Sequence, residues 1–256
     1  MKRIRHGDGS AAQSDKLPAW AQTFRDRLDN KTLEEIAAPF RSEKFQHLSR
    51  RYRDLPHNPL GPAKYFDVPV HLPESISKAL MLGLHRTGHP GRVFDVGCGF
   101  GYFLHVARAL GHDIMGLDFV DGNSVIPMGG NKQDAHCYTE VTSYLRIPRV
   151  LHEIRAMAPL PHSLLVSGTQ FDMITAFQIT FDLHSRQNLR WRVPEWEYFL
   201  NDLRELCNPD YRLVLEFNRG EDGDYMPDAL RDFFLSLGAT TVGERTVTFE
   251  DASGAS

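Results

Sequence analysis

The chain contains little cysteine, little net charge and no long apolar run. Its three cysteines, Cys98, Cys137 and Cys207, show neither paired spacing nor a metal-ligand pattern, so reduced thiols in a cytosol are the simplest interpretation. The formal net charge of −4 argues against a general nucleic-acid-binding protein, which usually carries a strong basic excess. No run is long enough to span a membrane, and residues 1–16 lack the apolar core of a signal peptide. We therefore expect a cytoplasmic protein with no membrane partner.

The composition is sufficient for a buried core. Hydrophobic residues make up 41% of the 256 residues and aromatic residues 11%. This length is compatible with one large α/β domain or two smaller ones. We expect disordered tails at 1–16 and 251–256, a helical and proline-rich cap segment at 17–90, and the main domain at 91–250.

The most informative stretch runs from Val93 to Phe103. An apolar run is interrupted by Asp95, three glycines follow at alternate positions, and a helical pattern continues to Leu110. This order predicts the first strand, loop and helix of a nucleotide-binding α/β sheet. Glycine allows a sharp turn and lets a ligand approach the main chain, and the start of the following helix offers free N–H groups.

The spacing of the glycines distinguishes between nucleotides. A dinucleotide fingerprint is G-x-G-x-x-G, but here Tyr102 stands where its last glycine belongs. A second predicted strand follows Gly111 and ends at Asp118, about twenty residues after the glycine turn, where a ribose-binding acid is expected. An NAD-dependent enzyme is therefore only a distant alternative.

In these residues the chain resembles the class I S-adenosylmethionine-dependent methyltransferases. Asp95 and the three glycines match the family's first motif, Asp118 matches its second, and Phe171–Gln178 looks like its fourth. Asn208–Asp210 departs from the family's usual Pro-Gly-Gly turn. The resemblance implies a Rossmann-like, mainly parallel sheet with helices on both faces, an antiparallel C-terminal strand, and S-adenosylmethionine as the cofactor.

The resemblance also assigns cofactor-binding residues. We expect the methionyl part and ribose near the glycine loop, the adenine near the loop that follows a predicted strand Val150–Ile154, and the methionyl end near Phe171–Gln178. The residues concerned are Asp95, Gly97, Cys98, Gly99, Gly101, Asp118, Phe119, Ala156, Met157, Phe177 and Gln178. No metal is expected, because the cofactor itself carries the reactivity.

Periodicity and proline content predict the remaining elements. We expect two helical pieces within 17–46, the second opened by a capping box of Thr32 and Glu35, and an extended segment from Arg50 to Pro73 because of its prolines. Residues 121–143 show no clear pattern. The other expected elements are a helix at Ser75–Gly88, strands at Arg92–Val96, Phe171–Phe177, Tyr211–Phe217 and Thr246–Phe249, and helices at Pro194–Leu206 and Asp228–Leu237.

The substrate side is less sharply indicated. The segment Phe181–Pro194 is either a lid over the cofactor cleft or a solvated connector, and it contains His184, the candidate general base, and Trp191. Tyr65 is a second candidate substrate residue, the alternative being that it packs the N-terminal helices onto the sheet. The chain lacks the Asp/Asn-Pro-Pro-aromatic and Pro-Cys signatures, which argues against methylation of DNA bases.

We therefore expect a methyltransferase that transfers a methyl group to a small-molecule acceptor by in-line displacement. Two alternatives remain open: a methyltransferase of RNA or protein, and a non-catalytic subunit of this fold that binds a partner. The sequence indicates neither the acceptor atom nor the oligomeric state.

Overall fold

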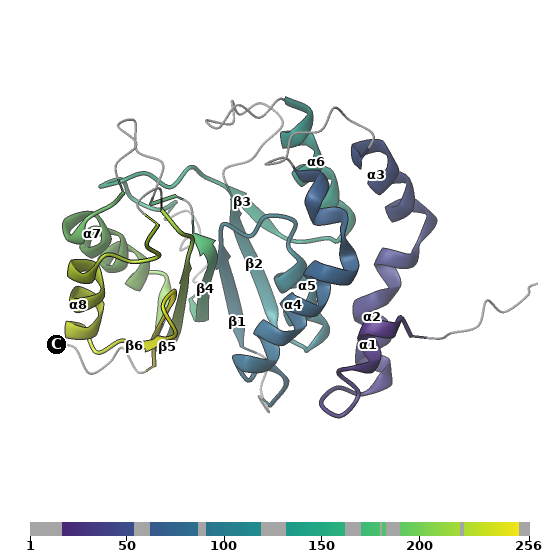
Figure 1. Ribbon diagram of the computed structural model, residues 1–256, viewed down its shortest axis with the longest axis horizontal. Helices are drawn as coiled ribbons and strands as arrows, with labels where there is room; N and C mark the ends of the chain where they lie inside the picture. Colours follow the sequence, from purple (N-terminus) through teal and green to yellow (C-terminus); the bar gives the residue numbers. More distant parts are fainter. Residues whose placement is uncertain are drawn as a thin grey trace, which may run out of the picture.

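A mixed sheet of seven strands lies between two layers of helices (Figure 1). The computed structural model describes residues 17–53, 62–86, 91–118, 132–161, 170–179, 181–182, 190–220 and 223–250. In these residues the strand order is β3-β2-β1-β4-β5-β7-β6. The strands are β1 (Arg92–Val96), β2 (Asp113–Asp118), β3 (Arg149–Leu151), β4 (Phe171–Ile179), β5 (Cys207–Phe217), β6 (Thr240–Val242) and β7 (Thr246–Phe249).

The course of the chain through the sheet defines where a ligand would bind. Strands β1 to β3 progress toward one edge, and the chain then returns to place β4 beside β1 and β5 beside β4, all in parallel. Strand β7 is antiparallel to β5, and β6 is antiparallel to β7. The expected fold class is confirmed, including the antiparallel strand at Thr246–Phe249. The direction of progress reverses between β1 and β4, and open α/β sheets bind ligands at the carboxyl ends of strands at such a switch point.

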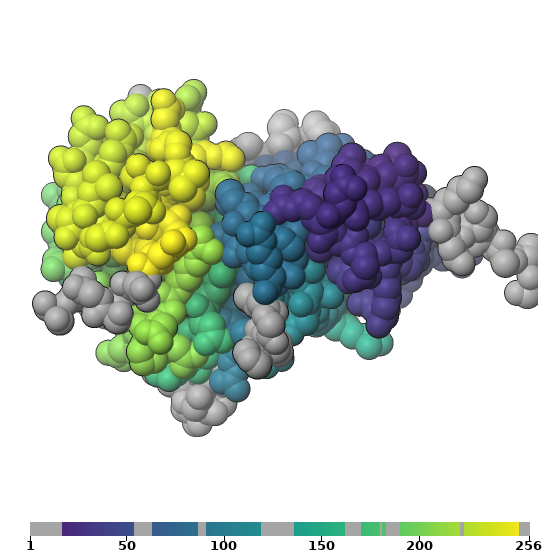
Figure 2. All heavy atoms as spheres, turned by 90° about the horizontal axis from the view of Figure 1, so that it is seen from below, coloured from purple at the N-terminus to yellow at the C-terminus, as the bar shows by residue number. Residues whose placement is uncertain are grey.

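Helices cover both faces of this sheet (Figure 1). Helices α4, α5 and α6 lie on one face and α7 and α8 on the other, while α1 to α3 form an outer layer against α4 to α6. Seen from below, the N-terminal helices and the C-terminal segment occupy opposite sides (Figure 2). The helices are α1 (Ala19–Gln22), α2 (Asn30–Arg41), α3 (Glu43–Arg53), α4 (Val68–Met81), α5 (Tyr102–Ala109), α6 (Lys132–Tyr144), α7 (Val193–Arg204) and α8 (Asp228–Ser236), with short 3₁₀ turns η1 (Pro62–Phe66) and η2 (Leu84–Arg86).

Alternation along the strands divides the apolar residues between two cores. Val93, Met173 and Val214 face α4 and α5 and belong to one cluster with the buried residues of α2 and α3. Phe94 and Trp196 belong to the second cluster, under α7 and α8, where the Trp196 side chain is fully buried. The segment that precedes the sheet therefore shares the core of one sheet face. No helix in the described parts of the chain has the length and apolar content needed to cross a bilayer.

The expectation of an extended segment up to Pro73 is wrong. Helix α3 continues to Arg53, and α4 begins at Val68, seven residues before the predicted helix start. Pro69 lies in the first turn, where its missing N–H costs no helical hydrogen bond. Pro73 lies inside the helix and removes one hydrogen bond, but α4 buries Leu72, Ser75, Ile76, Ala79 and Leu80. Burial of this face outweighs the lost bond.

The structure differs from the prediction in five smaller points. Helix α2 is capped by Asp29, whose Oδ1 accepts the Thr32 N–H at 2.8 Å, so the proposed box of Thr32 and Glu35 is wrong. The weakly patterned residues 132–143 belong to α6. Strand β3 ends at Leu151, and β6 has no counterpart in the prediction. Strand β5 begins at Cys207, so Asn208–Asp210 lies in an irregular part of a strand and not in a separate turn.

Candidate functional site

A buried carboxylate marks the switch point between β1 and β4. Asp95 lies opposite Thr175 in the register of the two strands, and the Thr175 hydroxyl donates a hydrogen bond of 2.7 Å to Asp95 Oδ1. Asp95 is only 4% exposed. The first motif of the sequence therefore lies at the position where open α/β sheets bind ligands.

The glycine loop between β1 and α5 leaves open space beside its main chain. Gly97, Gly99 and Gly101 have φ values of 77°, 54° and 75°, a region that L-residues with a Cβ rarely occupy. Among the described residues, a Cβ placed on Gly97 or Gly99 would meet no atom within 4 Å, whereas one on Gly101 would lie 2.8 Å from Ile147 Cγ1. The first two glycines thus leave space beside the main chain of the loop, and Gly101 allows close packing.

The acid at the end of β2 is joined to this loop. Asp118 Oδ2 accepts the N–H of Gly99 at 2.7 Å, and Asp118 is 5% exposed. The loop is also tied to β2 by the N–H groups of Gly97 and Cys98, which donate to Leu117 O at 2.7 and 3.1 Å. The structure therefore brings the first two sequence motifs together in one cradle, with a carboxylate beside the glycine main chain.

The side chain of Cys98 is explained by packing. A Cβ on Gly116 of β2 would lie 2.5 Å from Cys98 Sγ, so the thiol occupies the space that this glycine leaves. Burial raises the pKa of the Cys98 thiol well above its ordinary value, with smaller contributions from Asp118 and Asp95 in the same direction. The thiol is therefore protonated at neutral pH, and any contact of Cys98 with a cofactor is expected from its main chain.

Burial also perturbs Asp95. It raises the pKa of the Asp95 carboxyl from 3.8 to about 7, although the hydrogen bond from Thr175 and the charge of Lys78 act to lower the pKa. The neighbouring carboxylate of Asp118 acts to raise it. Asp95 thus changes its charge close to neutral pH.

This perturbation predicts a pH-dependent gain in stability for Asp95→Asn. The folded chain holds the Asp95 proton more tightly than the unfolded chain, so the contribution of Asp95 to stability falls as pH rises from about 4 to about 7. At pH 8 the variant should be more stable than the parent by on the order of 2–4 kcal/mol, and at pH 4 the difference should vanish. Denaturant titrations at both pH values measure this, with Asp113→Asn on the same sheet as the control. An equal difference at both pH values would rule out a buried, charged Asp95.

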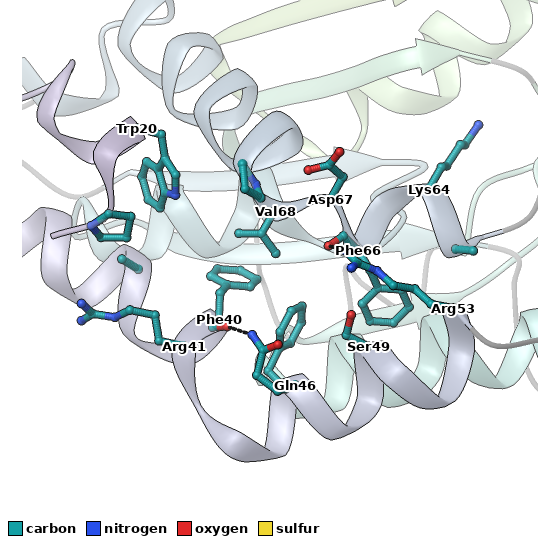
Figure 3. A pocket seen from close by; sticks show the side chains of 15 residues that line it. Trp20, Phe40, Arg41, Gln46, Ser49, Arg53, Lys64, Phe66, Asp67 and Val68 are labelled. Atoms are coloured by element: carbon teal, nitrogen blue, oxygen red, sulfur yellow. Dashed lines mark hydrogen bonds between the residues drawn. The ribbon is translucent and has the colours of Figure 1, made fainter. Parts of the chain in front are cut away.

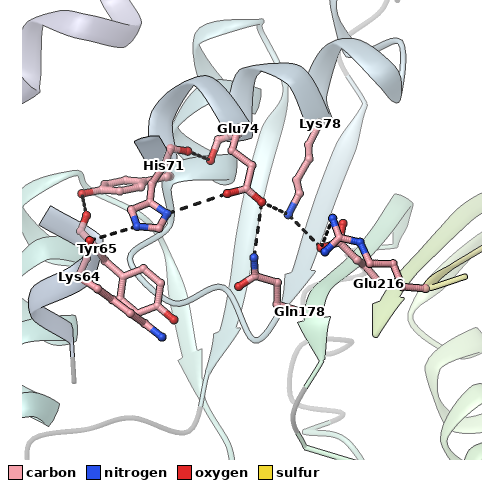
Figure 4. A network of polar contacts seen from close by, with 10 residues as sticks. Lys64, Tyr65, His71, Glu74, Lys78, Gln178 and Glu216 are labelled. Atoms are coloured by element: carbon pink, nitrogen blue, oxygen red, sulfur yellow. Dashed lines mark hydrogen bonds and ion pairs between the residues drawn. The ribbon is translucent and has the colours of Figure 1, made fainter. Parts of the chain in front are cut away.

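Helix α4 adds a polar network at the carboxyl ends of β4 and β5 (Figure 4). Lys78 Nζ lies 3.1 Å from Glu74 Oε1 and 3.4 Å from Glu216 Oε1, and 4.4 Å from the ring centroid of Phe177. The Lys78 side chain is 13% exposed and that of Glu216 only 5%. The expected cofactor residue Phe177 therefore has the largely buried Lys78 ammonium group over its ring.

Tyr65 lies where this network meets the glycine loop. Its ring centroid is 5.4 Å from that of Phe100, and its carbonyl accepts the Tyr102 hydroxyl at 2.7 Å. Beside it, His71 Nε2 lies 3.1 Å from Lys64 O, and His71 Nδ1 lies 4.0 Å from Glu74 Oε2 (Figure 4). Tyr65 thus packs the N-terminal segment against the loop, and its contact with a substrate stays a prediction.

Gln178 adopts a strained backbone conformation at the end of β4. Its φ is 54°, in the left-handed region that favours glycine. The carbonyl of Gln178 accepts Asn218 Nδ2 at 2.9 Å, and its side chain reaches Glu74 Oε1 at 3.5 Å. Strain of this kind accumulates at functional sites, so it supports the expected role of Gln178 in the cleft.

The remaining expected site residues are Ala156, Met157, Trp191, His184 and Phe119. Ala156 and Met157 lie on an exposed turn beyond β3, where Met157 is 57% exposed and has a φ of 56°. The expectation that Trp191 presents its ring to a substrate needs correction, because the ring is 4% exposed and packs against Phe181 and Trp196 in the core under α7. His184 and Phe119 lie outside the described residues.

Sequence reasoning missed four residues of this site. Thr175 and Glu216 are polar residues inside apolar strands, the same signal that drew attention to Asp95, and this signal was available. Glu74 and Lys78 are one helical turn apart on α4. Because an extended segment was expected up to Pro73 and a helix only from Ser75, the sequence did not indicate that they share a helix face. Their placement depends on α4 starting at Val68.

A groove of about 840 Å³ lies elsewhere, between the N-terminal helices and the start of α4 (Figure 3). Aromatic residues of α2, α3 and η1 form part of its wall, and Arg41, Arg53 and Lys64 line it as well. All its lining residues lie between Pro18 and Pro69. The groove is therefore separate from the glycine loop, and Phe66, which also contacts Phe100, forms part of the partition.

Comparison with known proteins finds similarity only at the level of solved structures. No protein-family model matches the chain, and no curated protein sequence matches it either. Similar solved structures include the magnesium protoporphyrin IX methyltransferase ChlM of Synechocystis PCC 6803 with bound S-adenosylhomocysteine, at 17% identity over 86% of this chain and 98% of that one, with a TM-score of 0.45.

Two further solved structures extend the comparison. The TDP-rhamnose 3'-O-methyltransferase CalS11 of calicheamicin biosynthesis is 13% identical over 82% of this chain and 95% of that one, with a TM-score of 0.44. The glycopeptide N-methyltransferase MtfA in complex with S-adenosylmethionine is 12% identical over 57% of this chain, with a TM-score of 0.38. The present chain covers 56% of MtfA, little more than half of its length. All three proteins are described as methyltransferases.

Proposed function

We infer that the chain is an S-adenosylmethionine-dependent methyltransferase. The observation that carries this inference is the hydrogen bond between the Gly99 N–H and Asp118 Oδ2, which joins the acid of β2 to an open glycine loop at the switch point. The donor set fits the group: a carboxylate at a strand end suits ribose hydroxyls, and a main chain without Cβ atoms suits close approach of the methionyl part. A buried carboxylate at Asp95 suits an ammonium group.

Each group of the cradle has a separate task in this proposal. Asp118 accepts hydrogen bonds from the ribose, the main chain of Gly97 to Gly99 lies against the methionyl part, and Asp95 faces its ammonium group. Phe177 and Gln178 line the methionyl end, and the turn at Ala156 and Met157 covers the adenine. When bound, the cofactor supplies a methyl group on a sulfonium, which is activated for displacement.

The acceptor in this proposal is a small molecule. The protein has to orient it opposite the sulfonium and keep water away, because the displacement is in-line. The segment 17–90 serves as the cap, with Tyr65 against the loop and Glu74 at the end of β4. The polar network combines two carboxylates, Glu74 and Glu216, with the Lys78 ammonium, whereas an RNA methyltransferase would need a basic rim.

Transfer of a radiolabelled methyl group tests this function. The purified chain is incubated with S-[methyl-³H]adenosylmethionine and, separately, with small-molecule, RNA and protein fractions of a cell extract. We expect label in the small-molecule fraction and none with Gly99→Val. Label in RNA or protein would support the first alternative function, and no label in any fraction, with cofactor binding intact, would support a non-catalytic subunit.

A further inference from the structure

A largely buried lysine lies where the proposed cofactor site meets α4. Lys78 lies between the helix and the sheet, and its side chain is 13% exposed. A buried ammonium group is costly unless carboxylates compensate it, and Glu74 and Glu216 do so at 3.1 and 3.4 Å. Apolar side chains in place of both Lys78 and Glu216 would often cost no stability, so the presence of the ion pair needs an explanation.

The strand register places the sheet residues that Lys78 contacts on the same face of the sheet as Asp95. Asp95 pairs with Thr175, and Thr175 pairs with Val214, so the three residues form one row across the sheet. Phe177 and Glu216 lie two residues further toward the carboxyl ends and therefore point to the same face. Lys78 contacts both of them, which puts its ammonium group above this row. The charge of Lys78 acts to lower the pKa of Asp95.

We propose that Lys78 is a positioning residue for the cofactor, whose ammonium group favours the charged form of the Asp95 carboxyl, the form that binds the methionyl ammonium. This inference rests on the proposed function. It adds a residue from α4 that no sequence motif contains, and it gives the network in Figure 4 a task on the cofactor side of the cleft. Glu74 and Glu216 hold Lys78 in place.

The charges that face Asp95 make this contribution necessary. From β2, the Asp118 carboxylate disfavours a second negative charge, and burial does so more strongly. The Cys98 thiol of the loop is neutral, and Thr175 supplies one hydrogen bond. From β5, Glu216 adds another negative charge, which is shared between Lys78 and Arg245 Nη2 at 3.7 Å. Lys78 is thus the cation on α4 that offsets the acids around Asp95.

The test measures S-adenosylhomocysteine binding by calorimetry between pH 6 and pH 8.5. In the parent chain, affinity should increase as pH rises through about 7, because Asp95 must lose its proton. In Lys78→Met the midpoint of this pH dependence should move up by about one pH unit, which weakens binding about fivefold at pH 7 and about ninefold at pH 6. Lys78→Arg should restore the parent midpoint. Lys31→Met, at a surface lysine of α2, is the matched control.

Two further variants separate this role from a structural one. Asp95→Asn should abolish the pH dependence, and adding Lys78→Met to it should change the affinity no further. Glu216→Gln removes a negative charge near Lys78 and should move the midpoint to lower pH, the opposite direction. This second variant keeps the inference testable if Lys78→Met does not fold.

Three results would overturn the inference while leaving the proposed function intact. They are an unchanged midpoint in Lys78→Met, additive effects of the Lys78 and Asp95 variants, and loss of the Lys78→Met effect with decarboxylated S-adenosylmethionine. That ligand keeps the ammonium and lacks the carboxylate, so such a loss would mean that Lys78 binds the carboxylate directly. Absence of S-adenosylhomocysteine binding by the parent chain would instead overturn the proposed function, and the inference with it.

Discussion

Gly99→Val is expected to abolish cofactor binding while the chain stays folded. A Cβ at Gly99 would meet no atom of the described part of the chain within 4 Å, so the new side chain projects into the space beside the loop. The φ of 54° adds backbone strain of roughly 1–3 kcal/mol, which a folded domain tolerates. Calorimetry with S-adenosylhomocysteine should show at least a hundredfold weaker binding, equivalent to about 2.7 kcal/mol or more.

Gly83→Val is the matched control for this substitution. Gly83 also has a positive φ, 75°, and no atom of the described residues within 4 Å of its would-be Cβ, but it follows the C-terminal end of α4 and is not part of the glycine loop. The two variants should lose similar amounts of stability, and only Gly99→Val should lose binding. Equal affinities would mean that the loop is not the binding surface.

Asp118→Ala is expected to weaken S-adenosylhomocysteine binding by roughly 2–3 kcal/mol, or about 30- to 150-fold. Two losses contribute. The ribose hydroxyls lose a charged acceptor, and the Gly99 N–H loses the carboxylate that it bonds at 2.7 Å. Asp118→Asn keeps a carbonyl oxygen for Gly99 but no charge, so its affinity should lie between those of the parent chain and Asp118→Ala.

Asp113→Ala serves as the control on the same strand. Asp113 begins β2 at the opposite end from Asp118 and is exposed, so its removal should leave both affinity and stability within experimental error. An unchanged affinity in Asp118→Ala, measured on folded protein, would remove Asp118 from the site.

The part of the site that follows from local sequence could be predicted. An acid inside the apolar strand β1, three glycines and a helix define the loop without tertiary information. The position of the second acid was also predictable. The glycine turn, α5 and β2 are short and regular, so the carboxyl end of β2, with Asp118, must lie beside the loop that follows β1. The hydrogen bond from Gly99 to Asp118 is the geometric result.

The part supplied by α4 could not be predicted by the same reasoning. Two prolines in Val68–Met81 argue locally against a helix, but one lies in the first turn and the buried face compensates for the other. The contacts of Lys78 with Glu216 and Phe177 join residues far apart in the sequence, so only the tertiary packing of α4 on β4 and β5 reveals them.

Aromatic residues near the predicted cleft were equally ambiguous. Composition alone does not separate a ring that lines a pocket from one that fills a core. Trp191 belongs to the core under α7, whereas Tyr65 lies against Phe100 of the glycine loop. Short elements such as β3 and β6, with three residues each, carry too little periodicity to be assigned from sequence.

The central claim is that the cradle of Asp95, the glycine loop and Asp118 binds S-adenosylmethionine. Parallel calorimetric titrations of the parent chain with S-adenosylhomocysteine and with NADH test it most directly. We expect saturable binding of S-adenosylhomocysteine at one site per chain and no comparable binding of NADH. Tight binding of NADH without binding of S-adenosylhomocysteine would contradict the account.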